Sequence, residues 1–131
     1  MPELYRNDFM TLVEADGQLT LSWSREEPND EHALGTARAV VKALDDHMHH
    51  AAGKKYLVLV DLMVVGKTFP RATAAYTQWM LGHRDKIKAG AFATKSFLLR
   101  TAVSAAMIVP GLTMKGFSNL EDAGAFLKSK A

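Results

Sequence analysis

The chain has 131 residues, of which 48% are hydrophobic, 16 are lysine or arginine and 14 are aspartate or glutamate. This length fits one domain, and the hydrophobic fraction is that of a folded protein, which excludes a disordered chain. A net charge of +2 without a long basic run argues against nucleic acid or an anionic membrane surface as a partner. The absence of cysteine excludes disulfides, thiolate metal sites and thiol catalysis, and it favours a cytoplasmic location.

Targeting and membrane-spanning segments are not expected. The first residues lack an apolar segment followed by a small-residue cleavage site, so no signal peptide is predicted. The longest apolar stretches, 56–65 and 102–109, are far shorter than the roughly 20 residues that a membrane-spanning helix needs. We therefore expect one domain over residues 1–131, with the polar residues 1–8 loosely held.

The first predicted elements are the two strands of a hairpin. Apolar and polar side chains alternate over 18–24, as they do in a strand with one buried face, and 9–13 form the preceding strand. Asp16 and Gly17 lie between these strands, and both residue types tolerate a positive φ. The sequence therefore predicts a tight turn at this pair.

A loop and a long helix should follow the hairpin. The loop contains the adjacent carboxylates Glu26 and Glu27, for which no surrounding pocket is predicted. Asn29 or Asp30 can cap the helix, because their side-chain oxygens accept from free backbone N–H groups. Apolar residues at helical spacing continue the helix to just before Gly53.

The remaining two thirds of the chain alternate strands with helices. Residues 55–65 are apolar without alternation, which is typical of a strand buried on both faces. The further predicted elements are a helix starting at 69–70, a strand at 89–94, a helix over 96–109 and a strand at 113–117. Ser118 and Glu121 match a capping box, which predicts the start of the last helix.

The predicted order of elements is ββαβαβαβα. Strands that alternate with helices favour parallel pairing with right-handed crossovers, whereas the opening hairpin is antiparallel. The expected fold class is therefore α/β, with a five-stranded, mixed and mostly parallel sheet and four helices.

Three segments carry a resemblance to a known family. They are the buried strand over 56–62 with an aspartate near its end, the alanine-rich helix over 96–109, and the C-terminal segment over 114–127. The last of these joins a strand ending in phenylalanine, a capped turn and a Glu-Asp-Ala sequence. In these features the chain resembles the SpoIIAA-like group of the STAS superfamily, over roughly residues 8–130. The resemblance implies a STAS fold and a non-enzymatic regulatory module that binds proteins.

The phosphorylation switch of this family does not carry over to the chain. In the anti-sigma-factor antagonists the second helix begins with an Asp-Ser pair whose serine is phosphorylated. The corresponding segment here, 66–71, has no such pair, and Thr68 is only the nearest hydroxyl. The SpoIIAA-like group has also been likened to the CRAL-TRIO lipid-binding fold, so the resemblance leaves a small-molecule ligand open as an alternative.

Basic and hydroxyl side chains follow two of the predicted parallel strands. They are Lys67, Thr68 and Arg71 at the second helix, and Lys95, Ser96 and Arg100 at the third. Because parallel strands end at the same edge of a sheet, both groups should lie on one rim, where helix N-termini and cations favour an anion. The alternative is ordinary capping with solvated charges, and no glycine-rich phosphate loop supports the sharper interpretation.

An aromatic stripe marks the second predicted helix. Tyr76, Trp79, Met80 and His83 lie at helical spacing, which predicts either core packing or a surface for a protein partner. The partner interpretation makes this stripe the interface of a homodimer.

Neither a metal site nor a catalytic site can be assembled from the sequence. His47, His49 and His50 lie at a helix end near Asp46, where charged histidines suit the helix dipole, and the chain lacks a three- or four-ligand motif. An enzyme would require a pocket that unites Asp61 with His83. We therefore expect no catalytic residue, metal or cofactor, and we interpret Asp61 as an acceptor of backbone N–H bonds after its strand.

Two functions remain open at this stage. The first is a regulatory module that binds a protein partner through the second helix and that self-associates. The second is a domain that binds a small molecule or lipid between the sheet and the second and third helices, with Lys95 and Arg100 contacting an anionic group.

Overall fold

The computed structural model describes residues 3–50, 53–106, 110–112 and 114–131. The strands found there are β1 (Glu3–Arg6), β2 (Met10–Ala15), β3 (Gln18–Trp23), β4 (Tyr56–Asp61), β5 (Ile87–Ala93) and β6 (Met114–Phe117). The helices are α1 (Asp30–His49), α2 (Pro70–Gly82), α3 (Phe97–Ala106) and α4 (Leu120–Lys130), with a short 3-10 helix at Arg84–Lys86. None of these helices is long and apolar enough to cross a membrane.

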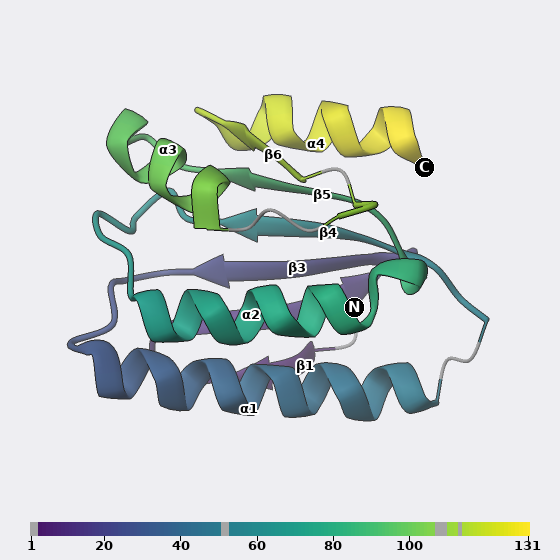
Figure 1. Ribbon diagram of the computed structural model, residues 1–131, viewed down its shortest axis with the longest axis horizontal. Helices are drawn as coiled ribbons and strands as arrows, with labels where there is room; N and C mark the ends of the chain where they lie inside the picture. Colours follow the sequence, from purple (N-terminus) through teal and green to yellow (C-terminus); the bar gives the residue numbers. More distant parts are fainter. Residues whose placement is uncertain (1–2, 51–52, 107–109, 113) are drawn as a thin grey trace.

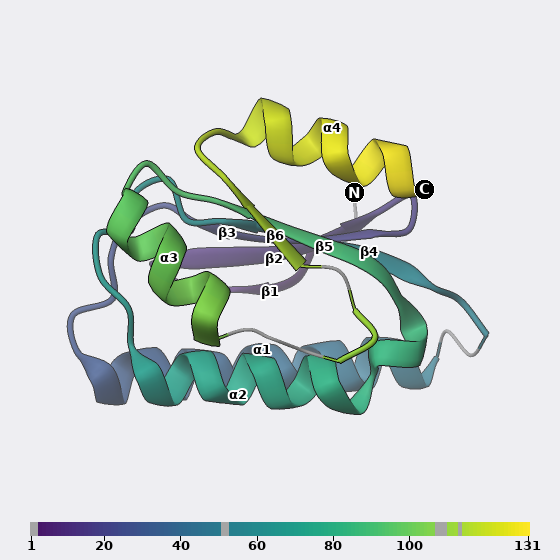
Figure 2. The ribbon, with the colours of Figure 1, turned by 45° about the horizontal axis from the view of Figure 1, so that its top comes forward.

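The strands form one mixed sheet with helices on both faces. Its order is β1-β2-β3-β4-β5-β6, with antiparallel pairing among the first three strands and parallel pairing from β3 to β6. Helices α1, α2 and α3 cover one face and α4 covers the other (Figures 1 and 2). The predicted α/β class and the mostly parallel sheet are confirmed.

The hairpin turn forms where it was predicted. Ala15 pairs with Gln18, and Asp16 and Gly17 between them have φ values of 51° and 82°. Two successive positive φ values match the twist of the flanking strands, which explains why an Asp-Gly pair occupies this turn.

The N-terminal residues correct the predicted strand count. Residues 1–8 were expected to be loosely held, but Tyr5 and Arg6 pair with Leu12 and Thr11 in the antiparallel strand β1. The strand was missed because it is short and polar at both ends. Leu4 and Tyr5 nevertheless pack against the core, which holds the segment on the sheet edge and gives the sheet six strands in place of five.

Strand β4 ends earlier than its apolar sequence predicts. It stops at Asp61, whose carboxylate accepts from the backbone N–H of Met63 at 3.1 Å and from the hydroxyl of Ser22 at 2.9 Å. The Val65 N–H then donates to the Leu62 carbonyl at 3.1 Å, which closes a turn. The predicted strand over 55–65 is therefore too long, whereas the interpretation of Asp61 as a turn acceptor agrees with this geometry.

Side-chain caps set the starts of three helices. Asn29 caps α1 by accepting from the His32 N–H at 2.8 Å, and Ser96 accepts from the Leu99 N–H at 3.1 Å at the start of α3. The capping box predicted at Ser118 is displaced by one residue, because Asn119 is the residue that accepts from the Asp122 N–H at 2.8 Å. The predicted end of α3 at 107–109 and residue 113 lie outside the described residues.

The core has two layers that differ in side-chain size. The layer beneath α1, α2 and α3 is built from large residues, including Leu12, Leu44, Tyr56 and Phe92. The layer beneath α4 is built around alanines of β5, namely Ala89, Ala91 and Ala93, packed with Ala123 and Leu127. Small residues let α4 lie close to the sheet, whereas larger groups separate the opposite helices from it.

Candidate functional site

A cavity of about 110 Å³ lies between the sheet and helices α1, α2 and α3. Its lining is mostly apolar and comes from Leu21, Trp23, Ala33, Leu44, Val58, Val60, Leu62, Val65, Phe69, Ala72, Trp79, Met80, Leu99 and Val103. The polar residues in its wall are Glu27, Lys67, Thr68, Thr73 and Tyr76. Engineered apolar cavities of about 150 Å³ bind benzene, so this space suits a ring or a short alkyl group.

Local sequence explains why space remains under the helices. Ala33, Ala37 and Ala72 make the contact between α1 and α2, so these helices approach each other closely. The floor of the cavity is formed by branched residues of the central strands, including Leu21, Val58 and Val60. The short side chains between the helices leave a hollow that the branched residues do not fill.

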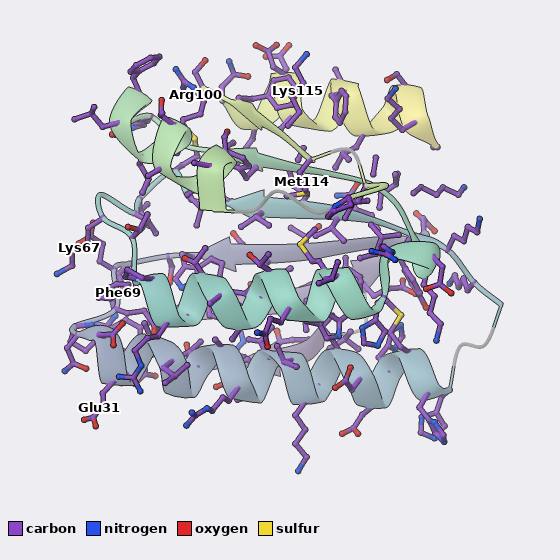
Figure 3. All side chains as sticks on the ribbon, viewed as in Figure 1. Glu31, Lys67, Phe69, Arg100, Met114 and Lys115 are labelled. Carbon is purple, nitrogen blue, oxygen red and sulfur yellow. The ribbon has the colours of Figure 1, made fainter. Side chains whose placement is uncertain are left out.

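Two loops close one end of the cavity. The Gly66 N–H in the loop before α2 donates to the carboxylate of Glu26 in the loop before α1. Lys67 and Phe69 lie on the same loop, at the left of Figure 3, and both line the cavity. A second depression of about 180 Å³ runs between α2 and α3 and shares Thr68 and Thr73 with the cavity. The groove between the helices therefore adjoins the cavity.

Glu27 is a buried acid in the cavity wall. Only 5% of the residue is exposed, although it lies in a loop. Its Oε1 accepts from the hydroxyl of Thr36 at 2.8 Å, whereas its Oε2 has no hydrogen-bond partner among the described residues. The Nδ1 of His32 approaches Oε2 to 3.4 Å. The expectation that Glu26 and Glu27 have no pocket around them is therefore wrong for Glu27.

Tyr76 supplies a second orphan oxygen among the residues of the cavity wall. Its hydroxyl is buried and lacks a hydrogen-bond partner in the described part of the chain. Burial raises the pKa of this phenol well above its usual range, and the negative charges of Glu27 and Tyr5 raise it further. The Tyr76 ring meets the Trp23 ring edge to face, with centroids 6.1 Å apart.

The remaining residues of the predicted interface stripe lie at the other end of α2. Trp79 and Met80 are buried and line the cavity, so the structure favours their alternative interpretation as core residues. The Trp79 Nε1–H donates to Asp45 at 2.9 Å, and the His83 ring stacks on Trp79 with centroids 4.8 Å apart. Sequence spacing placed these residues on one helix but could not show which of them are accessible.

The predicted anion rim follows the carboxyl ends of β4 and β5, as parallel pairing requires. At α2, Lys67 and Thr68 line the cavity, whereas Arg71 donates to Asp30 of α1 at 3.0 Å. Lys67 also lies over the Phe69 ring, with its Nζ 5.3 Å from the centroid.

The half of the rim at α3 lies away from the cavity. Lys95 is exposed, and Ser96 is engaged as the helix cap. Arg100 donates to the Thr94 carbonyl at 3.4 Å and lies over the Phe97 ring (Figure 3). The cavity lies between the sheet and the helices, where the alternative function places a ligand. Neither Lys95 nor Arg100, the predicted contacts of an anionic group, lines this cavity.

The histidines near the end of α1 point to different partners. His47 Nε2 lies 3.2 Å from the Tyr56 hydroxyl and 3.6 Å from Glu14, whereas His50 Nδ1 lies 2.8 Å from the Asp46 carbonyl oxygen. Within the described ranges, no three side chains of the kinds that ligate metals gather at one point.

Asp61 and His83 do not share a site. Asp61 ends β4, whereas His83 follows α2 and precedes β5, near the start of the parallel strands. The pocket that would unite them in an enzyme is therefore not formed.

Comparisons with known proteins identify the fold. No protein-family model matches the sequence, and no curated protein does. A solved structure of a variant of RsbS from Moorella thermoacetica matches with a TM-score of 0.62 and 11% identity, covering 92% of this chain and 95% of its own. An uncharacterised protein of the DUF3478 family from Shewanella loihica, described as having a SpoIIAA-like fold, matches with a TM-score of 0.61 and 17% identity. That match covers 90% of this chain and 91% of the other.

These likenesses extend over nearly the whole length of each chain, and they agree with the order of strands and helices described above. The resemblance that the sequence motifs indicated is thereby confirmed for the fold. The chain has a SpoIIAA-like fold.

Proposed function

We propose that this protein is a non-enzymatic, cytoplasmic binding module whose cavity beneath α2 and α3 takes a small apolar ligand. The observation that carries the proposal is the apolar cavity itself, about 110 Å³ in volume and lined by residues of three helices and the sheet. Binding pockets of this kind combine apolar walls with a few polar groups, and Glu27 and Tyr76 supply such groups here.

The energetics of the cavity favour an occupant. Mutations that open cavities in protein cores cost about 24 cal/mol for each Å³ that remains empty. A ligand that fills the space recovers part of this free energy without moving the sheet, so even a small hydrocarbon should bind.

Toluene is a suitable first probe, because it is apolar and close to the cavity in size. We expect a titration followed by ¹H–¹⁵N NMR to shift amide signals around the cavity, including those of Leu44 and Val103. The variant Val103→Phe should abolish these shifts by filling the space. Val64→Phe is the matched control, since Val64 is half exposed and lies outside the cavity lining. Saturable shifts that persist unchanged in Val103→Phe would refute the proposal.

A protein partner is the second candidate function, and one specific observation favours it. Phe97 and Leu98 in the first turn of α3 are 68% and 80% exposed, and Val64 before α2 is 50% exposed. Exposed apolar residues grouped at one edge are typical of interaction surfaces. We propose that a second copy of the chain covers this edge in a regulatory homodimer.

Light scattering with size-exclusion chromatography tests the second candidate. The wild-type protein should show a dimer at tens of micromolar, and Leu98→Glu should shift it to the monomer because a carboxylate would be buried at the contact. Lys95→Glu changes the charge next to the patch without removing an apolar group and serves as the control. A strictly monomeric wild-type protein would contradict the dimer and leave the ligand proposal standing.

A further inference from the structure

Glu27 and Tyr76 are two of the polar residues in the cavity wall, and the charge of Glu27 acts on the Tyr76 phenol. Both residues line the cavity, and each has a buried oxygen atom without a hydrogen-bond partner in the described structure, Oε2 of Glu27 and the hydroxyl of Tyr76. Buried polar atoms are nearly always bonded, because an unmade hydrogen bond is costly away from water. Two such oxygens on residues of one cavity wall therefore indicate a missing partner that carries a donor.

Among the described residues, no lysine or arginine pairs with Glu27. Arg71 bonds Asp30, and Lys67 is exposed and lies over the Phe69 ring. His32 approaches Glu27, but 41% of its side chain is exposed. A buried carboxylate with one neutral donor, the Thr36 hydroxyl, has a strong preference for a further donor or positive charge.

The aromatic residues of the wall also favour a ligand with a positive charge or an apolar body. Trp23, Phe69 and Tyr76 all line the cavity. The faces of aromatic rings attract cations, and they accept the hydrocarbon part of a ligand equally well. A ligand carboxylate at this place would instead meet the like charge of Glu27.

We propose that the ligand is a small apolar molecule whose polar end is an uncharged or positively charged hydrogen-bond donor, an ammonium or a hydroxyl group, held by Glu27 and Tyr76. The Oε2 atom of Glu27 accepts from the donor, and the Tyr76 hydroxyl completes the contact. The apolar body of the ligand fills the space between Val58, Val103 and Leu44. This assignment of the polar end rests on the proposed ligand-binding function and goes beyond it.

Four compounds with the same ring separate the contributions of the body and of the polar end. Toluene measures the apolar cavity alone, benzylamine adds an ammonium, benzyl alcohol adds a hydroxyl and benzoate adds an anion. By NMR titration, we expect benzylamine or benzyl alcohol to bind at least about tenfold tighter than toluene, and benzoate to bind more weakly than toluene. The two donor compounds show which donor the site prefers.

Variants then locate the polar contact. Tyr76→Phe and Glu27→Gln should each reduce the advantage of the donor compound over toluene to threefold or less, while toluene itself binds as before. Tyr5→Phe is the matched control, because Tyr5 is a partly buried tyrosine that does not line the cavity. If Glu27→Gln does not fold, Tyr76→Phe alone decides the outcome.

The failures of the two proposals can be told apart. If toluene binds in the cavity and benzoate matches or exceeds the donor compounds, the assignment of the polar end is overturned while the binding function stands. The same holds if the donor advantage persists in Tyr76→Phe and Glu27→Gln. If none of the four compounds binds, both proposals are wrong.

Discussion

Tyr76 shows how one residue can combine a structural cost with a binding role. Its ring packs against the core, but its hydroxyl is buried without a partner among the described residues. Replacing a buried unsatisfied hydroxyl by hydrogen removes the cost of keeping it from water. A residue selected for stability alone would be phenylalanine at this position, so the retained hydroxyl supports a role in recognition.

The stability of Tyr76→Phe tests this interpretation without a ligand. We expect the variant to be as stable as the wild type or more stable by up to about 2 kcal/mol, measured by urea unfolding at pH 7. A loss of more than 1 kcal/mol would show that the hydroxyl makes a hydrogen bond in the free protein, and would contradict the view that it lacks a partner.

Alkaline pH offers a second measurement on the buried tyrosines. Burial raises the pKa of Tyr56 and of Tyr76 above the usual value near 10. Above that value the unfolded chain releases protons that the folded chain retains, so stability falls as the pH rises. Each phenol contributes up to about 1.4 kcal/mol per pH unit.

Tyr76→Phe should therefore flatten the fall in unfolding free energy between pH 9.5 and 11. Equal slopes in the wild type and in Tyr76→Phe would contradict the raised pKa of Tyr76.

Two glycines distinguish a crowded site from an open one. A Cβ added to Gly116 of β6 would lie 2.6 Å from the Phe92 ring and 2.9 Å from Arg100, whereas one added to Gly124 of α4 would meet no atom within 4 Å. We expect Gly116→Ala to cost about 1–3 kcal/mol through overpacking against the buried Phe92. Gly124→Ala should stabilise the protein by about 0.5–1 kcal/mol, because alanine is the better helix former.

Urea unfolding of both alanine variants gives the comparison. We expect the free energy of unfolding to fall in Gly116→Ala and to rise in Gly124→Ala. A Gly116→Ala variant that is as stable as the wild type would contradict the close packing of β6 against Phe92.

At the scale of elements, most strands and helices could be predicted because local signals agreed with the final packing. Alternation marked β3, the Asp-Gly pair marked the hairpin turn, and Asn29 marked the start of α1. The errors arose where packing decided the outcome. Strand β1 is short and polar at its ends, and the apolar residues after Asp61 form a turn because that side chain accepts a backbone bond.

The start of α4 gives a matched test of a displaced cap. Asn119 accepts from the Asp122 N–H, whereas the sequence pattern placed the cap at Ser118. We expect Asn119→Ala to lower the unfolding free energy by about 1 kcal/mol and Ser118→Ala to change it by less than about 0.5 kcal/mol. A larger loss of unfolding free energy in Ser118→Ala than in Asn119→Ala would show that Ser118 is the cap, as the sequence pattern predicted.

For the molecule as a whole, the sequence predicted the order of the elements and left open a ligand site between the sheet and the second and third helices, but it did not predict the volume or the lining of the cavity. The order of strands and helices follows from alternation along the chain, and the parallel rim follows from that order. The cavity depends on how closely α1, α2 and α3 lie over β3 and β4, a distance that no local pattern encodes. The burial of Glu27 was missed for the same reason, since tertiary packing and not the local sequence decides whether a loop acid is buried.

Intermolecular NOEs test the central claim most directly, because they report contact between a ligand and particular methyl groups. With benzyl alcohol added to methyl-labelled protein, the ring protons should give NOEs to the methyls of Leu44, Val58 and Val103. In the variant Val103→Phe, the NOEs to Leu44 and Val58 should vanish. NOEs confined to exposed residues such as Leu98 and Val64, with none to the cavity methyls, would contradict the binding site beneath α2 and α3.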